Sequence, residues 1–310
     1  MSGDTTIQLR KLIDPFEVRP GTKVALERDH DPGFRGQWLN KAEGEHALRA
    51  GTELLARYQD RLAAQSTYAM LVVIQALDAA GKDGVIKHVL SGVNPQGVDV
   101  HSFKVPSAEE LSHDYLWRYG QRLPRRGQIV IFNRSHYEEV LVVRVHEELL
   151  DRQRLPPTAR TGDVWKGRYR EINAWERYLV DSGIHVVKLF LNVSREEQRQ
   201  RFLKRIEAPE HNWKFSSADI REREHWDEYQ RALSAMLSHT STEWAPWYVI
   251  PADHKWFERI AVGAVLVSKL LDIDPQYPKL DASAHRELEA AKAQLEAEGP
   301  ESAHAAPRPS

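Results

Sequence analysis

The sequence contains no cysteine. Disulfide bonds, a thiol nucleophile and a cysteine-based metal site are therefore excluded. It also lacks an apolar run long enough to span a membrane and a charged-then-apolar start typical of signal peptides, so we expect a cytoplasmic protein with no membrane partner. Charge of one sign is not in excess either, because 43 basic and 45 acidic residues give a formal net charge of −2. This balance argues against a surface coated with positive charge for binding nucleic acid.

The 310 residues, of which 41% are hydrophobic, leave room for one large α/β domain with appendages. Residues 1–64 form an N-terminal extension, in which apolar residues at helical spacing predict a long amphipathic helix from about residue 36 to residue 65. Residues 65–275 form the expected core. The stretch 276–310, rich in Ala, Glu and Pro, predicts a C-terminal helix and a disordered tail.

The stretch 68–84 has the features of a phosphate-binding loop. An apolar, β-branched run over residues 68–74 predicts a strand buried on both faces. Small residues then permit a tight turn, and a lysine opens a predicted helix that ends near residue 90. Backbone N–H groups and the positive end of the helix dipole attract an anion at such a turn, and the lysine adds a mobile charge. The residues of this turn are Asp78, Ala79, Ala80, Gly81, Lys82, Asp83 and Gly84.

The match to the standard P-loop pattern is imperfect. Ala76 stands where the first glycine is expected, and Asp83 replaces the Ser or Thr that holds magnesium. The carboxylates of Asp83 and Asp78 are oxygen ligands that could hold the cation instead. Taken alone, the turn fits a phosphate site and an ordinary strand-to-helix turn equally well.

Three further buried strands are predicted, over residues 128–133, 185–192 and 247–251. Helical periodicity between strands, as in residues 108–119 and 164–181, gives an alternation of strands and helices that predicts a doubly wound, mostly parallel sheet flanked by helices. Each strand runs directly into charged or small polar residues. Because ligands of open α/β sheets lie at the carboxyl ends of the strands, these residues should converge on one crevice with the phosphate loop.

Residues 194–230 predict two charged helices joined by a short bend. Ser194 followed by Glu197 is a capping-box signature for the first helix, on which Arg201 and Arg205 share one face. Pro209 ends that helix. Joined to a phosphate loop, such a hairpin is typical of a lid that carries arginines over phosphates and excludes water. A solvated hairpin held by internal Glu–Arg pairs is the alternative.

These motifs together resemble the polyphosphate kinase type 2 family over roughly residues 65–271, in the same order along the chain. The resemblance implies a P-loop kinase-like fold. Asn133 and Glu138 resemble the subgroup whose members phosphorylate nucleoside monophosphates as well as diphosphates. The motifs that carry the resemblance are 78–84 (DAAGKDG), 92–95 (GVNP), 114–118 (DYLWR), 132–138 (FNRSHYE), 197–214, 241–243 (STE) and 245–247 (APW).

The resemblance implies Mg²⁺-dependent phosphoryl transfer between inorganic polyphosphate and adenine or guanine nucleotides, by an enzyme that forms a homo-oligomer. His136 is interpreted as a packed or hydrogen-bonded histidine, since no metal-ligand pattern surrounds it. The implied catalytic residues are Asp78, Lys82, Asp83, Arg134 and Glu138, with Asp78 and Asp83 as Mg²⁺ ligands. The implied phosphate- or nucleotide-binding residues are Ala79, Ala80, Gly81, Gly84, Arg118, Asn133, Arg201, Arg205 and Lys214.

Two other functions remain open at this point. An ATP-dependent nucleotide or small-molecule kinase would use the same loop and lid. A non-catalytic regulator that binds polyphosphate or nucleotide would fit the substitutions at Ala76 and Asp83.

Overall fold

The computed structural model describes residues 9–36, 41–160, 162–209 and 217–298. The chain divides into two compact units, residues 1–276 and residues 277–310. In the second unit the structure describes one helix, α12 (Ala282–Glu298), which has no buried residue. The predicted tail falls in residues 299–310, outside the described part of the chain.

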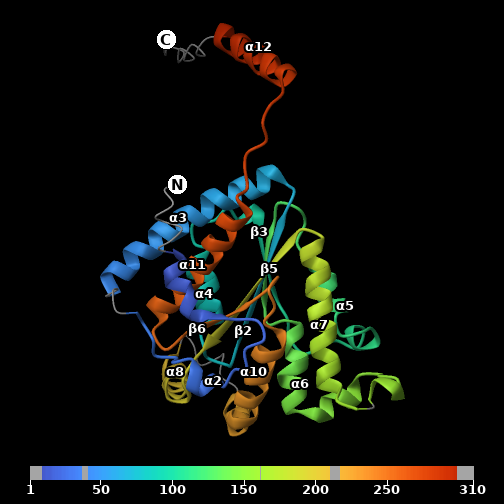
Figure 1. Ribbon diagram of the computed structural model, residues 1–310. Helices are drawn as coiled ribbons and strands as arrows, with labels where there is room; N and C mark the ends of the chain where they lie inside the picture. Colours follow the sequence, from blue (N-terminus) through green and yellow to red (C-terminus); the bar gives the residue numbers. More distant parts are fainter. Residues whose placement is uncertain (1–8, 37–40, 161, 210–216, 299–310) are drawn as a thin grey trace, which may run out of the picture. The chain divides into compact units, whose positions relative to one another are not determined.

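A six-stranded sheet forms the centre of the first unit (Figure 1), in the order β1-β6-β5-β2-β4-β3. Neighbouring strands are parallel except for β1, which pairs antiparallel with β6. The predicted doubly wound, mostly parallel sheet is therefore confirmed. The strands are β1 (Glu17–Val18), β2 (Ala69–Ala76), β3 (Val98–Ser102), β4 (Ile129–Asn133), β5 (Ile184–Asn192) and β6 (Trp247–Pro251).

Helices cover both faces of this sheet, as Figure 1 shows. Within the described part of the first unit, residues 9–13 are helical, and the α-helices with described bounds are α2 (Leu26–Asp29), α3 (Lys41–Gln65), α4 (Lys82–Val89), α5 (Trp117–Gly120), α6 (Val142–Val145), α7 (Val164–Asp181), α8 (Arg195–Glu207), α9 (Ser217–Glu222), α10 (Trp226–Thr240) and α11 (Lys255–Ile273). Short 3₁₀ helices are η1 (Asp14–Phe16), η2 (Pro95–Gly97), η3 (Glu110–Ser112), η4 (His136–Val140), η5 (Glu147–Arg152), η6 (Pro157–Ala159) and η8 (Arg223–His225).

The alternating side chains of β2 divide the core into two layers. Met70, Val72 and Ile74 belong to one hydrophobic cluster, which contains residues of α3, α4 and α11. Leu71 and Val73 belong to the other, which contains residues of α7 and α10. Because successive strand side chains point to opposite faces, a strand covered on both sides must be apolar throughout, which explains the unbroken run seen in the sequence.

Two local predictions were wrong. The edge strand β3 was missed because its side chains are exposed or half-buried, so it lacks the apolar run of a buried strand. The continuous helix predicted over residues 108–119 is instead η3, an extended residue at His113, and the short helix α5. The side chain of Asp114 accepts a hydrogen bond from the backbone N–H of Leu116 at 2.9 Å, a local turn that competes with helix formation.

Among the helices that the structure describes, none is both long enough and apolar enough to cross a membrane.

Candidate active site

A cleft of about 1260 Å³ lies where β2 and β4 end. The carboxyl ends of β2, β4, β5 and β6 meet at one edge because the four strands are parallel. Ten of the predicted site residues line the cleft: Asp78, Ala79, Gly81, Lys82, Asp83, Gly84, Asn133, Arg134, Arg201 and Arg205. Residues from three distant parts of the sequence are thus brought together, as the strand-end pattern predicted.

The phosphate loop joins β2 to α4 through two residues with positive φ, Ala79 at 62° and Gly81 at 122°. Gly81 is the N-cap of α4, and no side chain caps the helix there. The N–H groups of the first turn of α4 therefore have no intrahelical partner, and together with the helix dipole they attract an anion. The loop has the backbone features of a phosphate cradle, although its side chains depart from the standard motif.

Lys82 lies at the start of α4, and its ammonium donates a hydrogen bond to the carbonyl oxygen of Ala76 at 3.0 Å. Burial lowers the pKa of this lysine, and the neighbouring guanidinium of Arg134 lowers it further. An anion bound in the cleft would favour the charged form of Lys82, so phosphate binding and the charge of this lysine support each other.

Arg134 directly follows β4 and is held between two carboxylates. Its guanidinium donates to Asp78 Oδ1 at 2.6 Å and to Glu138 Oε2 at 3.0 Å. The charge of Glu138 is the largest cause of a raised pKa at Arg134. The preceding residue, Asn133, donates to Asp83 Oδ1 at 2.9 Å. The loop after β4 is thereby fastened to the phosphate loop after β2, and a fixed positive charge faces the cleft.

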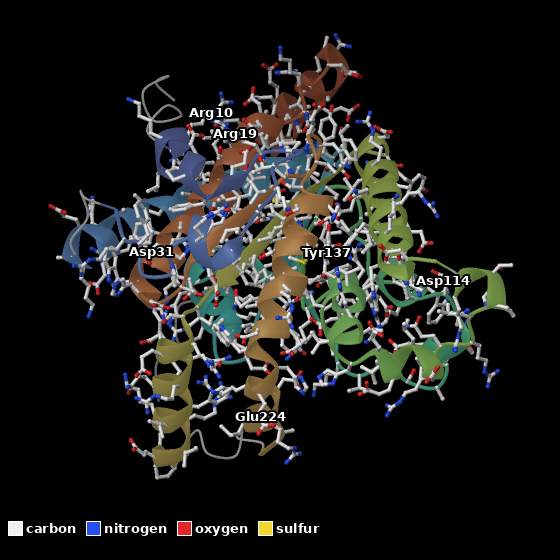
Figure 2. The ribbon with its side chains drawn as sticks, turned by 60° about the horizontal axis from the view of Figure 1, so that its bottom comes forward. Arg10, Arg19, Asp31, Asp114, Tyr137 and Glu224 are labelled. Carbon is white, nitrogen blue, oxygen red and sulfur yellow. The ribbon has the colours of Figure 1, made fainter. Side chains whose placement is uncertain are left out.

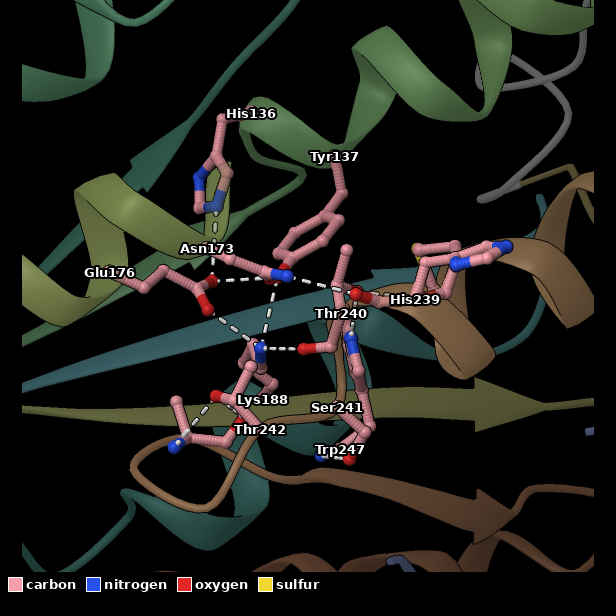
Figure 3. Close-up of polar contacts among 12 residues, drawn as sticks. His136, Tyr137, Asn173, Glu176, Lys188, His239, Thr240, Ser241, Thr242 and Trp247 are labelled. Atoms are coloured by element: carbon pink, nitrogen blue, oxygen red, sulfur yellow. Dashed lines mark hydrogen bonds and ion pairs between the residues drawn. The ribbon is translucent and has the colours of Figure 1, made fainter. Parts of the chain in front are cut away.

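A buried polar network supports η4, the turn that carries Glu138 (Figure 3). The ammonium of Lys188, in the middle of β5, donates to Glu176 at 2.6 Å, to the Tyr137 hydroxyl at 3.0 Å and to the Thr240 carbonyl at 2.5 Å. Tyr137 also donates to Glu176 at 2.7 Å. Burial opposes the charge of Glu176, but the Lys188 ammonium holds the pKa of this carboxyl below its usual value.

His136 contacts the same network and lies 3.3 Å from Glu176. It is fully buried and within hydrogen-bonding distance of Glu176, so its interpretation as a packed or hydrogen-bonded histidine is confirmed. The sequence did not predict that Lys188 is part of a buried polar network. A single lysine within an apolar strand does not indicate which carboxylate it will pair with after folding.

The helix that bears the predicted lid arginines is tied to the phosphate loop. The Ser194 side chain accepts from the N–H of Glu197 at 3.1 Å, which confirms the predicted helix start. From α8, Gln198 donates to the carbonyl oxygen of Asp78 at 2.9 Å. Figure 2 shows α8 and α10 extending side by side away from the sheet, with Glu224 where η8 joins α10.

Arg201 connects α8 both to the phosphate loop and to the segment after β6. It donates to the carbonyl oxygens of Ala79 and Ala80 in the phosphate loop and to that of Ala252 after β6. Its Nε donates to Glu197 at 2.8 Å, and the residue is only 7% exposed. In this structure the guanidinium therefore shapes the wall of the cleft, whereas contact of Arg201 with phosphate stays a prediction.

The other predicted residues occupy different positions. Arg205 pairs with Asp219 of α9 at 3.6 Å, at the cleft. Glu138 lines a smaller pocket next to the cleft, which shares Asp78 and Arg134 with it. Ala80 is buried beneath the loop.

Arg118 is the one described residue among the predicted binding residues that lies away from the cleft and its loop. Arg118 pairs with Glu110 at 3.1 Å and packs over the rings of Tyr119 and Phe103; Phe103 lines the cleft, but Arg118 itself does not. Lys214 lies outside the described residues. The phosphate- or nucleotide-binding role predicted for each stays a prediction.

Sequence reasoning missed several charged residues of the cleft. They are Lys41, Glu45, Lys104, Glu197, Lys204, Lys255, Glu258 and Arg259. Lys255, Glu258 and Arg259 lie at the start of α11, which follows β6 after a short polar segment that includes Asp253 and His254. Extending the strand-end argument by one helical turn would have found those three. Lys104 follows the missed edge strand β3.

The carboxylates present fit a magnesium ion that is shared with substrate. Within the described residues, no three His, Asp or Glu side chains are grouped as a metal site. Mg²⁺ is commonly bound through one or two carboxylates, with phosphate oxygens and water as its other ligands. Asp83 is exposed at the cleft and the Asp78 side chain is 33% exposed, so the carboxylates of both residues are accessible there.

A mostly parallel α/β sheet, with a tight loop before a helix N-terminus, a fixed arginine and exposed carboxylates at one strand edge, is typical of the P-loop kinase-like class. Comparison with known proteins gives the family. Residues 38–278 match the family "Polyphosphate kinase 2 (PPK2)", and the chain belongs to that family.

Named relatives and solved structures are similar over most of the chain. An ADP-polyphosphate phosphotransferase of Rhodopseudomonas palustris is 46% identical, covering 90% of this chain and 97% of the relative. An AMP/ADP-polyphosphate phosphotransferase of Meiothermus ruber is 44% identical, covering 87% and 97%. The crystal structure of polyphosphate kinase 2 from Arthrobacter aurescens has a TM-score of 0.79 and 37% identity, covering 88% of this chain and 95% of that one.

Proposed function

We propose that this protein transfers the terminal phosphoryl group of inorganic polyphosphate to AMP and to ADP, with Mg²⁺ as cofactor. The observation that carries the proposal is the cleft, where Lys82 and Arg134 face exposed carboxylates at the strand edge of a chain in the polyphosphate kinase 2 family. The names of the two relatives, one acting on ADP and the other on AMP and ADP, support both acceptors.

The residues suit transfer without a covalent enzyme intermediate. A phosphate oxygen of the nucleotide attacks the terminal phosphorus of the chain, the bond to the next phosphate breaks, and a polyphosphate shorter by one unit leaves. Lys82 and the N–H groups at the start of α4 hold phosphate oxygens, and Arg134 neutralises charge that spreads over the transferring group. Arg134 is oriented before substrate arrives, because Asp78 and Glu138 already hold it.

Asp78 and Asp83 are the residues that would hold Mg²⁺ together with phosphate oxygens. The ion supplies neutralising charge at the phosphates when it is bound. Asn133 bonds to Asp83 and therefore fixes the direction of that carboxylate. Guanine nucleotides as further acceptors, and a homo-oligomeric assembly, belong to the same proposal.

The test supplies polyphosphate and Mg²⁺ with AMP, ADP, GMP or GDP, omits every nucleoside triphosphate, and separates the nucleotides afterwards. We expect ADP and ATP from AMP and the corresponding guanine products. Turnover that appears only when ATP is added would favour an ATP-dependent kinase, and binding without turnover would favour a regulator. Omission of Mg²⁺ should abolish transfer, and light scattering gives the number of subunits.

A pair of variants on α4 tests the site. Lys82→Ala should lower turnover by about 10²–10³-fold, the loss typical of removing one group that stabilises a developing charge. Lys87→Ala is the matched control, because Lys87 is an exposed lysine on the same helix that does not line the cleft. Equal activity of both variants would contradict the proposed site.

A further inference from the structure

Glu258, in the first turn of α11, is a carboxyl buried against the phosphate loop. It is 1% exposed and lines the same cleft as Lys82. A Cβ atom built on Gly81 would lie 3.2 Å from each of its two carboxyl oxygens, so the carboxyl packs directly against the backbone of that glycine. Its Oε1 atom has no hydrogen-bond partner among the described residues. A buried carboxyl with an unpartnered oxygen at an anion site carries a desolvation cost, which calls for an explanation in terms of function.

Charged groups from three helices face this carboxyl. The cations are Lys82 of α4, Arg201 of α8, and Lys255 and Arg259 of α11. Asp78, Asp83, Glu197, Asp253 and His254 are the other titratable residues of this part of the cleft, and Lys41 and Glu45 line its α3 wall.

Burial outweighs the cations at Glu258. It raises the pKa of this carboxyl to about 8, although all four cations act to lower it. At neutral pH the group is therefore mostly protonated, and it ionises as the pH rises through about 8. A phosphate chain in the cleft would add negative charge and would engage the cations that favour the carboxylate, and both effects favour the protonated form.

We propose that Glu258 takes up a proton when a chain of phosphates fills the cleft, so that phosphate binding is coupled to protonation of this carboxyl. The inference rests on the proposed function, because it requires a phosphate chain at the loop. By linkage, a proton taken up on binding makes affinity fall as pH rises, towards a limit of about tenfold per pH unit for one proton.

Titration calorimetry with sodium tripolyphosphate tests the coupling. Binding is measured at about pH 8.5 in two buffers of different ionisation enthalpy, and the dependence of the heat on buffer gives the number of protons taken up. A group with a pKa near 8 is about three-quarters ionised there, so the wild-type protein should take up as much as about 0.75 proton more than the Glu258→Gln variant. Protons exchanged by the ligand itself are common to both proteins and cancel in this difference.

Glu45→Gln is the control, because Glu45 is an exposed carboxyl on another wall of the same cleft. It should show wild-type proton uptake, since water screens an exposed carboxylate. Should Glu258→Gln fail to fold, Glu258→Ala removes the carboxyl without placing an amide in the same space.

The outcomes separate the two proposals. Equal proton uptake by wild-type and Glu258→Gln protein, or a wild-type affinity that does not change between about pH 7.5 and 9, would overturn the role of Glu258 and leave the proposed function intact. A wild-type protein that binds no tripolyphosphate would overturn both.

Discussion

Replacement of Arg201 by lysine distinguishes an arginine that builds the site from one that only binds substrate. The substitution keeps the positive charge but replaces a planar fork by a single ammonium. In the structure, the two ends of the guanidinium reach carbonyl oxygens in separate segments, Ala79 and Ala80 on one side and Ala252 on the other. One ammonium cannot make all of these contacts, so buried carbonyl oxygens lose their donors.

The expected loss follows from the contacts. Hydrogen bonds to a charged group contribute about 1.5–3 kcal/mol each, and about two of them are lost at a residue that is 7% exposed. Arg201→Lys should therefore lower the free energy of unfolding by roughly 3–6 kcal/mol. For a domain of this size that corresponds to a fall of roughly 6–24 °C in Tm, at about 2–4 °C per kcal/mol.

Thermal unfolding of both proteins at one scan rate, without ligand, measures this loss. Arg199→Lys is the control, since Arg199 lies on the same helix, is 50% exposed in its side chain and forms its ion pair with the exposed Glu196. Its Tm should not change. If Arg201→Lys unfolded with the wild-type protein but lost affinity for tripolyphosphate, Arg201 would be a mobile phosphate ligand and the structural role argued here would be wrong.

Three further predictions concern the core and the loop. Lys188→Met should destabilise the protein by about 3–5 kcal/mol in urea titration, because the buried Glu176 carboxylate loses its counter-ion and keeps only neutral partners such as the Tyr137 hydroxyl. The double variant with Glu176→Leu should recover part of this loss, and a double variant that is worse than the single would contradict the pairing. Gly81→Ala should lower both stability, by about 1–3 kcal/mol, and turnover, since φ of 122° is strained for alanine and its Cβ would press on Glu258. Gly51→Ala, in the middle of α3 with open space around it, should instead be neutral or stabilising, and equal losses at both glycines would refute the argument. Because the folded pKa of Glu258 is raised from 4.5 to about 8, the unfolded state holds fewer protons between these values, so this group should reduce stability as pH rises from about 4.5 to 8. Glu258→Gln should remove that part of the pH dependence, and a variant whose unfolding followed pH as the wild type does would show that the carboxyl is not the cause.

The sequence alone determined the central strands, the mostly parallel class of the sheet and the position of the phosphate loop. These features are local: a strand buried on both faces must be apolar throughout, and a tight turn into a helix needs small residues within a few positions. The prediction of Ser194 as the helix start succeeded for the same reason, since a capping side chain acts within three residues. Position at a strand end was enough to bring Lys82, Asn133 and Arg134 to one edge.

Only the tertiary structure decided what several charged side chains contact. Arg201 meets the Ala80 carbonyl across 121 positions of sequence, and Lys188 meets Tyr137 across 51. Helical spacing placed Arg201 on a face of α8 but could not say whether phosphate or backbone carbonyls would meet that face. Likewise, nothing local marked Glu258 as a carboxyl packed against Gly81. Hydrogen bonds and desolvation depend on neighbours brought together by folding, and periodicity along the chain carries no information about those neighbours.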